Sequence, residues 1–101
     1  MAFVVCATWK ARPGEAGAVL GLLREVRAAS IAEPGCLLFA VHRSLEDPDV
    51  FFLYEQYTSE AAFASHAASD HVRRYVLDDA VARLESRRRE RFEIVDEPVT
   101  A

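Results

Sequence analysis

The sequence lacks most of the signatures that identify metal, redox and nucleotide-dependent proteins. Only two of its 101 residues are cysteines, Cys6 and Cys36, and they do not form the close pairs of zinc sites or redox dithiols. It contains no glycine-rich phosphate loop, no flavin or nicotinamide fingerprint, no metal-ligand motif and no serine or cysteine nucleophile signature. These absences predict a protein that works without a metal or an organic cofactor.

Long apolar runs are also missing. No run approaches the roughly 20 residues that a membrane span requires. The first ten residues have no basic segment ahead of their apolar stretch, so they predict a strand rather than a signal peptide. We therefore expect a cytoplasmic protein without a membrane partner.

Positive charge is in deficit, because the formal net charge is −4. This balance argues against a nucleic-acid partner. The basic run Arg87, Arg88, Arg89 and Arg91 alternates along a predicted strand and is interrupted by glutamate. We interpret it as a solvated edge strand whose charges discourage pairing with other sheets.

The residues that are present have the balance of one globular domain. The chain is 51% hydrophobic, 10% aromatic and 28% charged, and it has no low-complexity segment or linker. We expect a single domain over residues 1–101, with a loose tail from about residue 97.

Hydrophobic periodicity predicts alternating strands and helices. Two-residue alternation and β-branched or aromatic residues mark strands; a three-to-four-residue repeat marks helices, and Ser59 and Ser69 are suited to cap two of them. The predicted strands are 3–10, 36–45, 50–58 and about 88–95, and the predicted helices are 15–32, 60–68 and 71–86.

This order of elements predicts an α+β, ferredoxin-like βαββαβ fold, with a four-stranded antiparallel sheet and helices on one face. In that topology the first strand lies between the third and fourth, and the second strand lies at an edge. Cys6 and Cys36 should then be too far apart for a disulfide.

Several motifs in this order resemble the antibiotic biosynthesis monooxygenase family. They are Arg12-Pro13-Gly14-Glu15, Glu33-Pro34-Gly35-Cys36, and the segment Tyr54-Glu55-Gln56-Tyr57-Thr58-Ser59-Glu60-Ala61-Ala62-Phe63 followed by His66, Ser69 and His71. The resemblance covers nearly the whole chain. It implies a dimeric α+β barrel. The family includes oxygenases that oxidise quinols or anthrones without flavin or metal, haem-degrading enzymes, and an isomerase of a phosphorylated sugar derivative.

This sequence differs from some of these subfamilies at their characteristic residues, and the differences narrow the range of activities that the resemblance implies. The haem-degrading members have an asparagine on the first strand and a tryptophan near the position of His66, whereas this chain contains no asparagine and only Trp9. The anthrone oxygenases have asparagine, tryptophan and tyrosine where this sequence has Leu53, Tyr57 and Phe63. The resemblance therefore favours the quinol oxygenases and the isomerase.

Glu55 and His66 are the predicted catalytic residues. Leu53, Glu55 and Tyr57 share one strand face, which the resemblance turns toward the helices, and His66 lies on the same helical side as Phe63. A carboxylate that orients a neutral imidazole produces a general base near neutral pH. The alternative is a structural polar pair that ties the helix to the sheet.

The predicted substrate-binding residues are mainly aromatic. They are Tyr57, Leu53, Phe63, Trp9, His71 and Tyr75. The alternatives are core packing for the aromatics and a solvated first helical turn for His71.

Together these observations predict a cofactor-independent monooxygenase that acts on a small aromatic substrate, a quinol or a polyketide-like compound, and forms a homodimer. An isomerase that transfers a proton on a small carbonyl or phospho-sugar derivative, and a non-catalytic ligand-binding domain, are the alternatives.

Overall fold

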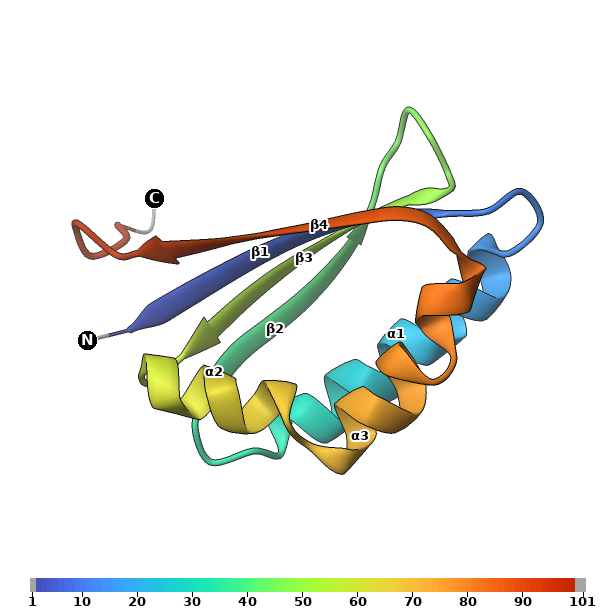
Figure 1. Ribbon diagram of the computed structural model, residues 1–101. Coiled ribbons are helices and arrows are strands. Elements are labelled where there is room, and N and C mark those ends of the chain that lie inside the picture. The colour runs from blue at the N-terminus through green and yellow to red at the C-terminus, as the bar shows by residue number, and fades with distance from the viewer. Residues whose placement is uncertain (1, 100–101) are drawn as a thin grey trace.

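The computed structural model describes residues 2–99. One antiparallel sheet carries the helices on one of its faces (Figure 1). The strands are β1 (Phe3–Ala11), β2 (Cys36–Arg43), β3 (Val50–Tyr57) and β4 (Leu84–Glu93). The helical elements are α1 (Ala16–Ile31), α2 (Glu60–Ala67), α3 (Asp70–Val72), the π-helical turn η1 (Arg73–Leu77) and the 3-10 helix η2 (Ala80–Arg83).

The strand order β2-β3-β1-β4 confirms the ferredoxin-like topology. The central strand β1 pairs with both β3 and β4, and β2 forms the opposite edge. Cys6 on β1 pairs with Tyr54, whereas Cys36 on the edge strand β2 pairs with Tyr57, so β3 separates the two cysteines. Both thiols are free. In the described part of the chain, no helix is long and apolar enough to cross a membrane.

The core lies between the sheet and α1. Phe51, Leu53 and Tyr57 lie on one face of β3 and are almost completely buried, in the same core cluster as Val19 and Leu23 of α1. The apolar face of β3, which repeats every two residues, and the apolar face of α1, which repeats about every 3.6 residues, therefore form one apolar layer. The predicted alternation of β3 is confirmed.

Two serines position the helices that follow β3. Ser59 accepts a hydrogen bond from the backbone N–H of Ala62 and caps α2. Ser69 Oγ donates to the backbone oxygen of His66 at 2.6 Å and accepts from the N–H of Val72 at 3.3 Å. One hydroxyl thus ends α2 and begins α3, and this fixes the bend between the helices that carry His66 and His71.

The predicted helix over residues 71–86 is wrong in its regularity and in its end. Its apolar residues recur every four positions, a repeat that drifts by about 40° per step around a 3.6-residue helix. The chain changes here from α-helix to the wider η1 turn and then to the tighter η2, instead of continuing as one regular helix. Leu84 is buried as the first residue of β4 and pairs with Ala11, so the strand begins four residues before its predicted start.

The remaining strand ends differ by about two residues from the prediction. β2 ends at Arg43 because the Ser44 hydroxyl accepts hydrogen bonds from the backbone N–H groups of Glu46 and Asp47 and starts the turn. β4 ends at Glu93, where its partner Phe3 is the first residue of β1. The described tail, residues 94–99, is neither helix nor strand, and residues 100–101 lie outside the described part.

Gly35 allows the loop between α1 and β2 to lie directly under α2. A Cβ atom at this position would lie 2.5 Å from the Cβ of Ala62. The same loop carries Glu33, so the close approach also brings that carboxylate toward α2. A larger residue at position 35 would have to push α2 and the loop apart.

We expect Gly35→Ala to lower the free energy of unfolding by about 1–3 kcal/mol, because the added methyl group overlaps α2. Gly21→Ala is the matched control, since its exposed site in α1 has open space and alanine favours helix by up to about 1 kcal/mol. Urea denaturation measures both changes. Equal stability of the Gly35→Ala and wild-type proteins would contradict the packing argument.

Candidate active site

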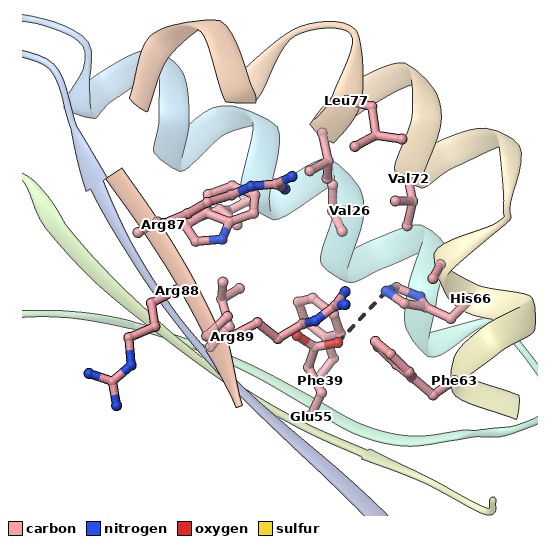
Figure 2. Close-up of a pocket in the computed structure, with 16 residues that line it drawn as sticks. Val26, Phe39, Glu55, Phe63, His66, Val72, Leu77, Arg87, Arg88 and Arg89 are labelled. Atoms are coloured by element: carbon pink, nitrogen blue, oxygen red, sulfur yellow. Dashed lines mark ion pairs between the residues drawn. The ribbon is translucent and has the colours of Figure 1, made fainter. Parts of the chain in front are cut away.

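A cavity of about 410 Å³ lies between the sheet and the helices. Its walls are mostly apolar, and they include Trp9, Leu23, Phe39 and Leu53. One end is polar, where Glu55 from β3 and His66 from α2 approach each other (Figure 2). An apolar enclosure with a few convergent polar groups is the usual form of a small-molecule site.

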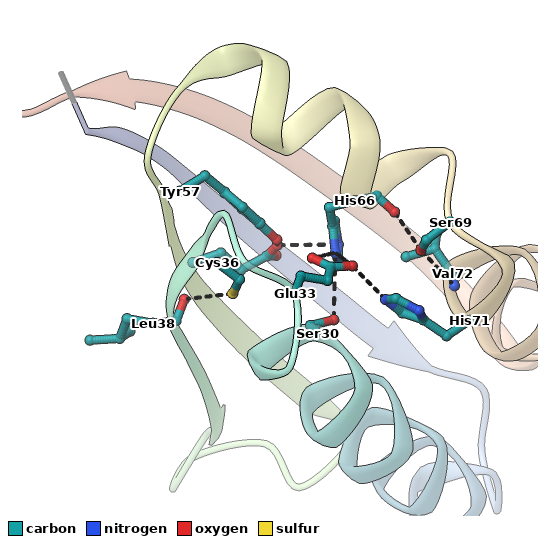
Figure 3. A network of polar contacts seen from close by, with 10 residues as sticks. Ser30, Glu33, Cys36, Leu38, Tyr57, His66, Ser69, His71 and Val72 are labelled. Atoms are coloured by element: carbon teal, nitrogen blue, oxygen red, sulfur yellow. Dashed lines mark hydrogen bonds and ion pairs between the residues drawn. The ribbon is translucent and has the colours of Figure 1, made fainter.

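His66 lies between two carboxylates. Its Nε2 atom is 3.7 Å from Oε1 of Glu55. Its Nδ1 atom is 3.1 and 3.2 Å from the two carboxylate oxygens of Glu33, and 3.5 Å from Oγ of Ser30 (Figure 3). The imidazole is 7% exposed, so its contacts with the two carboxylates are largely shielded from water.

Glu33 is the residue that orients His66. It follows the end of α1, where its backbone N–H donates to the backbone oxygen of Ser30 at 3.0 Å. An ionised carboxylate only accepts hydrogen bonds, so we assign the proton of the neutral imidazole to Nδ1. The lone pair of Nε2 then faces Glu55 and the cavity.

This arrangement changes the role expected of Glu55. The predicted contact between Glu55 and His66 is present, but 3.7 Å is too long for a hydrogen bond. Orientation comes instead from Glu33, which sequence reasoning did not select as a site residue. The only signal for Glu33 was its place in the Glu33-Pro34-Gly35-Cys36 motif, because 33 positions separate it from His66.

The electrostatic surroundings leave His66 neutral and Glu55 easily protonated. Burial lowers the pKa of His66 below its ordinary value, against the opposing influence of Glu33. Burial raises the pKa of Glu55 from 4.5 to about 7, although the Tyr57 hydrogen bond and the charge of Arg89 act in the other direction. The cavity therefore brings together an uncharged imidazole and a carboxyl group that titrates near neutral pH, which are groups able to act as a base and an acid.

Tyr57 is the hydrogen-bond donor to Glu55. Its hydroxyl lies 2.5 Å from Oε1 of Glu55. Burial, followed by the charge of Glu55, raises the pKa of the phenol above its ordinary value, so the hydroxyl keeps its proton. Tyr57 is fully buried beneath the site rather than in the cavity wall.

The other predicted substrate-binding residues divide into two groups. Trp9, Leu53 and Phe63 line the cavity. Tyr75 does not; it packs against the core, and the guanidinium of Arg74 lies 5.2 Å from its ring centre. His71 lies in α3, on the side of His66 away from this cavity.

Glu33, His66 and His71 form a cluster beside a second cavity of about 340 Å³. Nε2 of His71 lies 2.6 Å from Oε2 of Glu33, yet this buried nitrogen makes no hydrogen bond. The three donor atoms lie within 4.8 Å of one another. Two imidazoles and a carboxylate are a donor set that zinc and other transition metals accept, so these are the side chains that could hold an ion.

The basic run of β4 reaches the active-site cavity, which sequence reasoning missed. β4 is an edge strand, as predicted. Arg87, Arg88 and Arg89 all line the cavity. The side chains of Arg87 and Arg89 extend from the helix side of β4 toward it, whereas the guanidinium of Arg88 points away (Figure 2). The two-residue alternation of a strand was the available signal for this separation.

The site and the fold together define a class of protein: a ferredoxin-like α+β scaffold whose helix-covered sheet face encloses an acid–base pocket. The chain belongs to the antibiotic biosynthesis monooxygenase family, which it matches over residues 2–77. This match supports a monooxygenase at family level. No curated protein matches the sequence significantly.

Solved structures agree with this assignment. PA3566 from Pseudomonas aeruginosa is 29% identical, with a TM-score of 0.88 over 94% of this chain and 95% of that one. A structure named antibiotic biosynthesis monooxygenase is 26% identical, with a TM-score of 0.87 over 93% and 99%. Rv0793 from Mycobacterium tuberculosis is 24% identical, with a TM-score of 0.90 over 98% and 100%, and it shows likeness of fold alone.

The raised pKa of Glu55 makes stability depend on pH. The folded protein binds the Glu55 proton more tightly than the unfolded chain, so this stabilisation is full below pH 4.5 and is lost as pH rises through about 7. We expect the unfolding free energy of wild type minus that of Glu55→Gln to fall by up to about 3 kcal/mol over this range. Urea denaturation at several pH values measures it.

Glu25→Gln, at an exposed position of α1, is the control for removing a carboxylate without removing a buried one. A flat difference between wild type and Glu55→Gln would show that the folded protein does not hold the Glu55 proton.

Proposed function

We propose that this protein is a cofactor-independent monooxygenase that oxidises a small aromatic substrate, a quinol or a polyketide-like compound, with dioxygen. The observation that carries the proposal is the His66 imidazole, whose Nδ1 faces Glu33 and whose Nε2 faces an apolar cavity. A neutral imidazole held in this way is a general base for a phenolic hydroxyl. The family assignment supports the same reaction class.

In the proposed reaction, Nε2 of His66 takes a proton from a substrate hydroxyl. The resulting electron-rich carbon forms a bond with dioxygen, and the peroxide loses water. Hydroquinone plus dioxygen then gives hydroxyquinone plus water, so one oxygen atom stays in the product and the substrate supplies all the electrons. The protonated carboxyl of Glu55 is placed to supply the proton that leaves with the water.

The apolar walls of the cavity support this chemistry in two ways. Trp9, Phe39 and Leu53 provide flat and branched surfaces against which an aromatic ring can pack. A substrate packed against them would displace water, which strengthens electrostatic interactions and protects a reactive anion from protonation by solvent. Neither effect requires a flavin or a metal.

Proton transfer without oxygen is the second candidate. The close approach of His66 and Glu55, one acting as base and the other as acid, suits an isomerase that moves a proton beside the carbonyl of a small carbonyl or phospho-sugar derivative. Oxygen uptake distinguishes the two activities. A binding domain would show ligand protection without turnover.

We expect oxygen consumption with a panel of hydroquinones and anthrones, with neither flavin nor metal added, and its loss in His66→Ala. Removal of a general base should reduce turnover by a factor on the order of 10² to 10⁴. His42→Ala is the control, because His42 is exposed on β2 and does not line the cavity; its Nδ1 lies 3.1 Å from the backbone oxygen of Phe52, and its ring centre lies 5.6 Å from that of Phe52. An oxygen electrode and the melting temperatures of the same samples provide both measurements.

Glu33→Gln tests orientation separately. Glutamine keeps an acceptor for the Nδ1 proton but removes the charge that raises the pKa of His66. The acid limb of the pH–rate profile should therefore move to lower pH, with a smaller loss of turnover. If His66→Ala retains full turnover per folded molecule, the polar pair is structural and His66 is not the base.

We also propose a homodimer, because the sheet face opposite the helices is uncovered (Figure 1) and carries several exposed apolar side chains. Leu38 and Phe52 are each 39% exposed and Phe92 is 43% exposed, and Tyr54 is half-buried on the same face. Face-to-face packing of two sheets would cover this surface in both copies.

Sedimentation equilibrium at micromolar concentration should show a dimer, and Phe52→Lys should shift it toward monomer by placing a charge in the interface. Leu45→Lys is the control, since Leu45 is fully exposed in the turn between β2 and β3. A folded wild-type monomer at this concentration would contradict the proposal.

A further inference from the structure

The wall of the active-site cavity contains positive charge that the proposed reaction does not explain. Arg87 and Arg89 lie on the helix side of β4, beside Trp9 and Ala7 of β1. Both side chains extend toward the cavity in Figure 2, and both residues line it. The chain as a whole has a net charge of −4, so this is a local excess of the opposite sign.

Neither guanidinium has a carboxylate partner among the described residues. Within the run, the ion pair that forms is between Arg88 and Glu90, at 3.5 Å, and it involves the arginine that points away from the cavity. Arg89 instead lies 5.2 Å from the ring centre of Phe63, which is a cavity residue. Its guanidinium is thereby held near the polar end without being neutralised.

Among the residues that the structure describes, Glu55 is the only carboxylate in the cavity wall. It is already engaged by the hydroxyl of Tyr57 and lies opposite His66. It forms no ion pair with Arg87 or Arg89, although the charge of Arg89 acts on it, so both guanidinium groups can still bind an anion from outside. Planar guanidinium groups prefer carboxylates, which they can bind through two parallel hydrogen bonds.

We propose that Arg87 and Arg89 form an anion subsite, and that the substrate is an aromatic acid whose ring packs on the apolar walls while its carboxylate faces β4. This inference rests on the proposed function for the position of the reacting hydroxyl, which lies at His66. The carboxylate sets the orientation of the ring in the cavity, so Arg87 and Arg89 determine specificity.

The simplest alternative is the solvated edge strand expected from the sequence. A solvated role predicts that the three consecutive arginines, Arg87, Arg88 and Arg89, are equivalent. The subsite predicts that they are not, because strand alternation sends only Arg87 and Arg89 toward the cavity. Arg88 is therefore an internal control on the same strand.

The test compares 2,5-dihydroxybenzoate with 2,5-dihydroxybenzamide, which has nearly the same shape but no charge. Trp9 is the only tryptophan and lines the cavity, so its fluorescence reports binding directly. Wild type should bind the acid on the order of tenfold more tightly than the amide, since a charge-assisted hydrogen bond is worth that much or more. Added salt should reduce the preference.

Arg87→Gln and Arg89→Gln should each remove most of the preference for the acid, whereas Arg88→Gln should keep it. Melting temperatures of the three variants show that they are folded. Equal binding of acid and amide by wild type, an equal loss in Arg88→Gln, or no binding of either compound would overturn the subsite.

Oxygen uptake by the same samples separates this inference from the proposed function. Turnover of the amide at the rate of the acid, with equal affinity, would leave the monooxygenase intact and remove the subsite. Preferential binding of the acid without oxygen uptake would retain the subsite and remove the proposed reaction.

Discussion

The contact between Glu33 and His66 is the interaction on which the rest of the site depends. Without it, a buried imidazole at the end of α2 would have no strong polar partner on its Nδ1 side, and neither ring nitrogen would be selected for the proton. The fold brings the two residues together through the tight approach at Gly35 and the bend at Ser69. Backbone packing thus determines which nitrogen of His66 faces the cavity.

Burial and charge then act against each other within one small volume. The apolar layer of α1 and β3 raises the proton affinity of Glu55, while the nearby guanidinium of Arg89 lowers it. The balance leaves a carboxyl group that titrates close to neutral pH beside an imidazole that stays uncharged. Such opposing influences are how one pocket holds an acid and a base together.

The β4 arginines show that one residue type has different surroundings on the two faces of a strand. Arg88 belongs to the open face and pairs with Glu90. Arg87 and Arg89 belong to the helix face, where they meet the cavity instead of bulk water. The distinction depends on which side of the sheet the helices cover.

The sequence by itself determined the order of elements, the ferredoxin-like topology and the apolar layer of β3. These follow from local periodicity, from capping serines and from turn residues, all of which act over a few neighbouring positions. Together with the family resemblance, it also indicated that Glu55 and His66 lie close together: residue spacing gave the strand face and the helix face, and the resemblance turned that strand face toward the helices.

The partner of His66, the cavity position of Arg87 and Arg89, and the change of helix type after α3 were decided only by the tertiary structure. Each depends on contacts between residues far apart in the chain, such as His66 with Glu33 and Leu84 with Ala11. A residue's own spacing cannot show which distant backbone will approach it, because that approach is set by the packing of whole elements against a shared core.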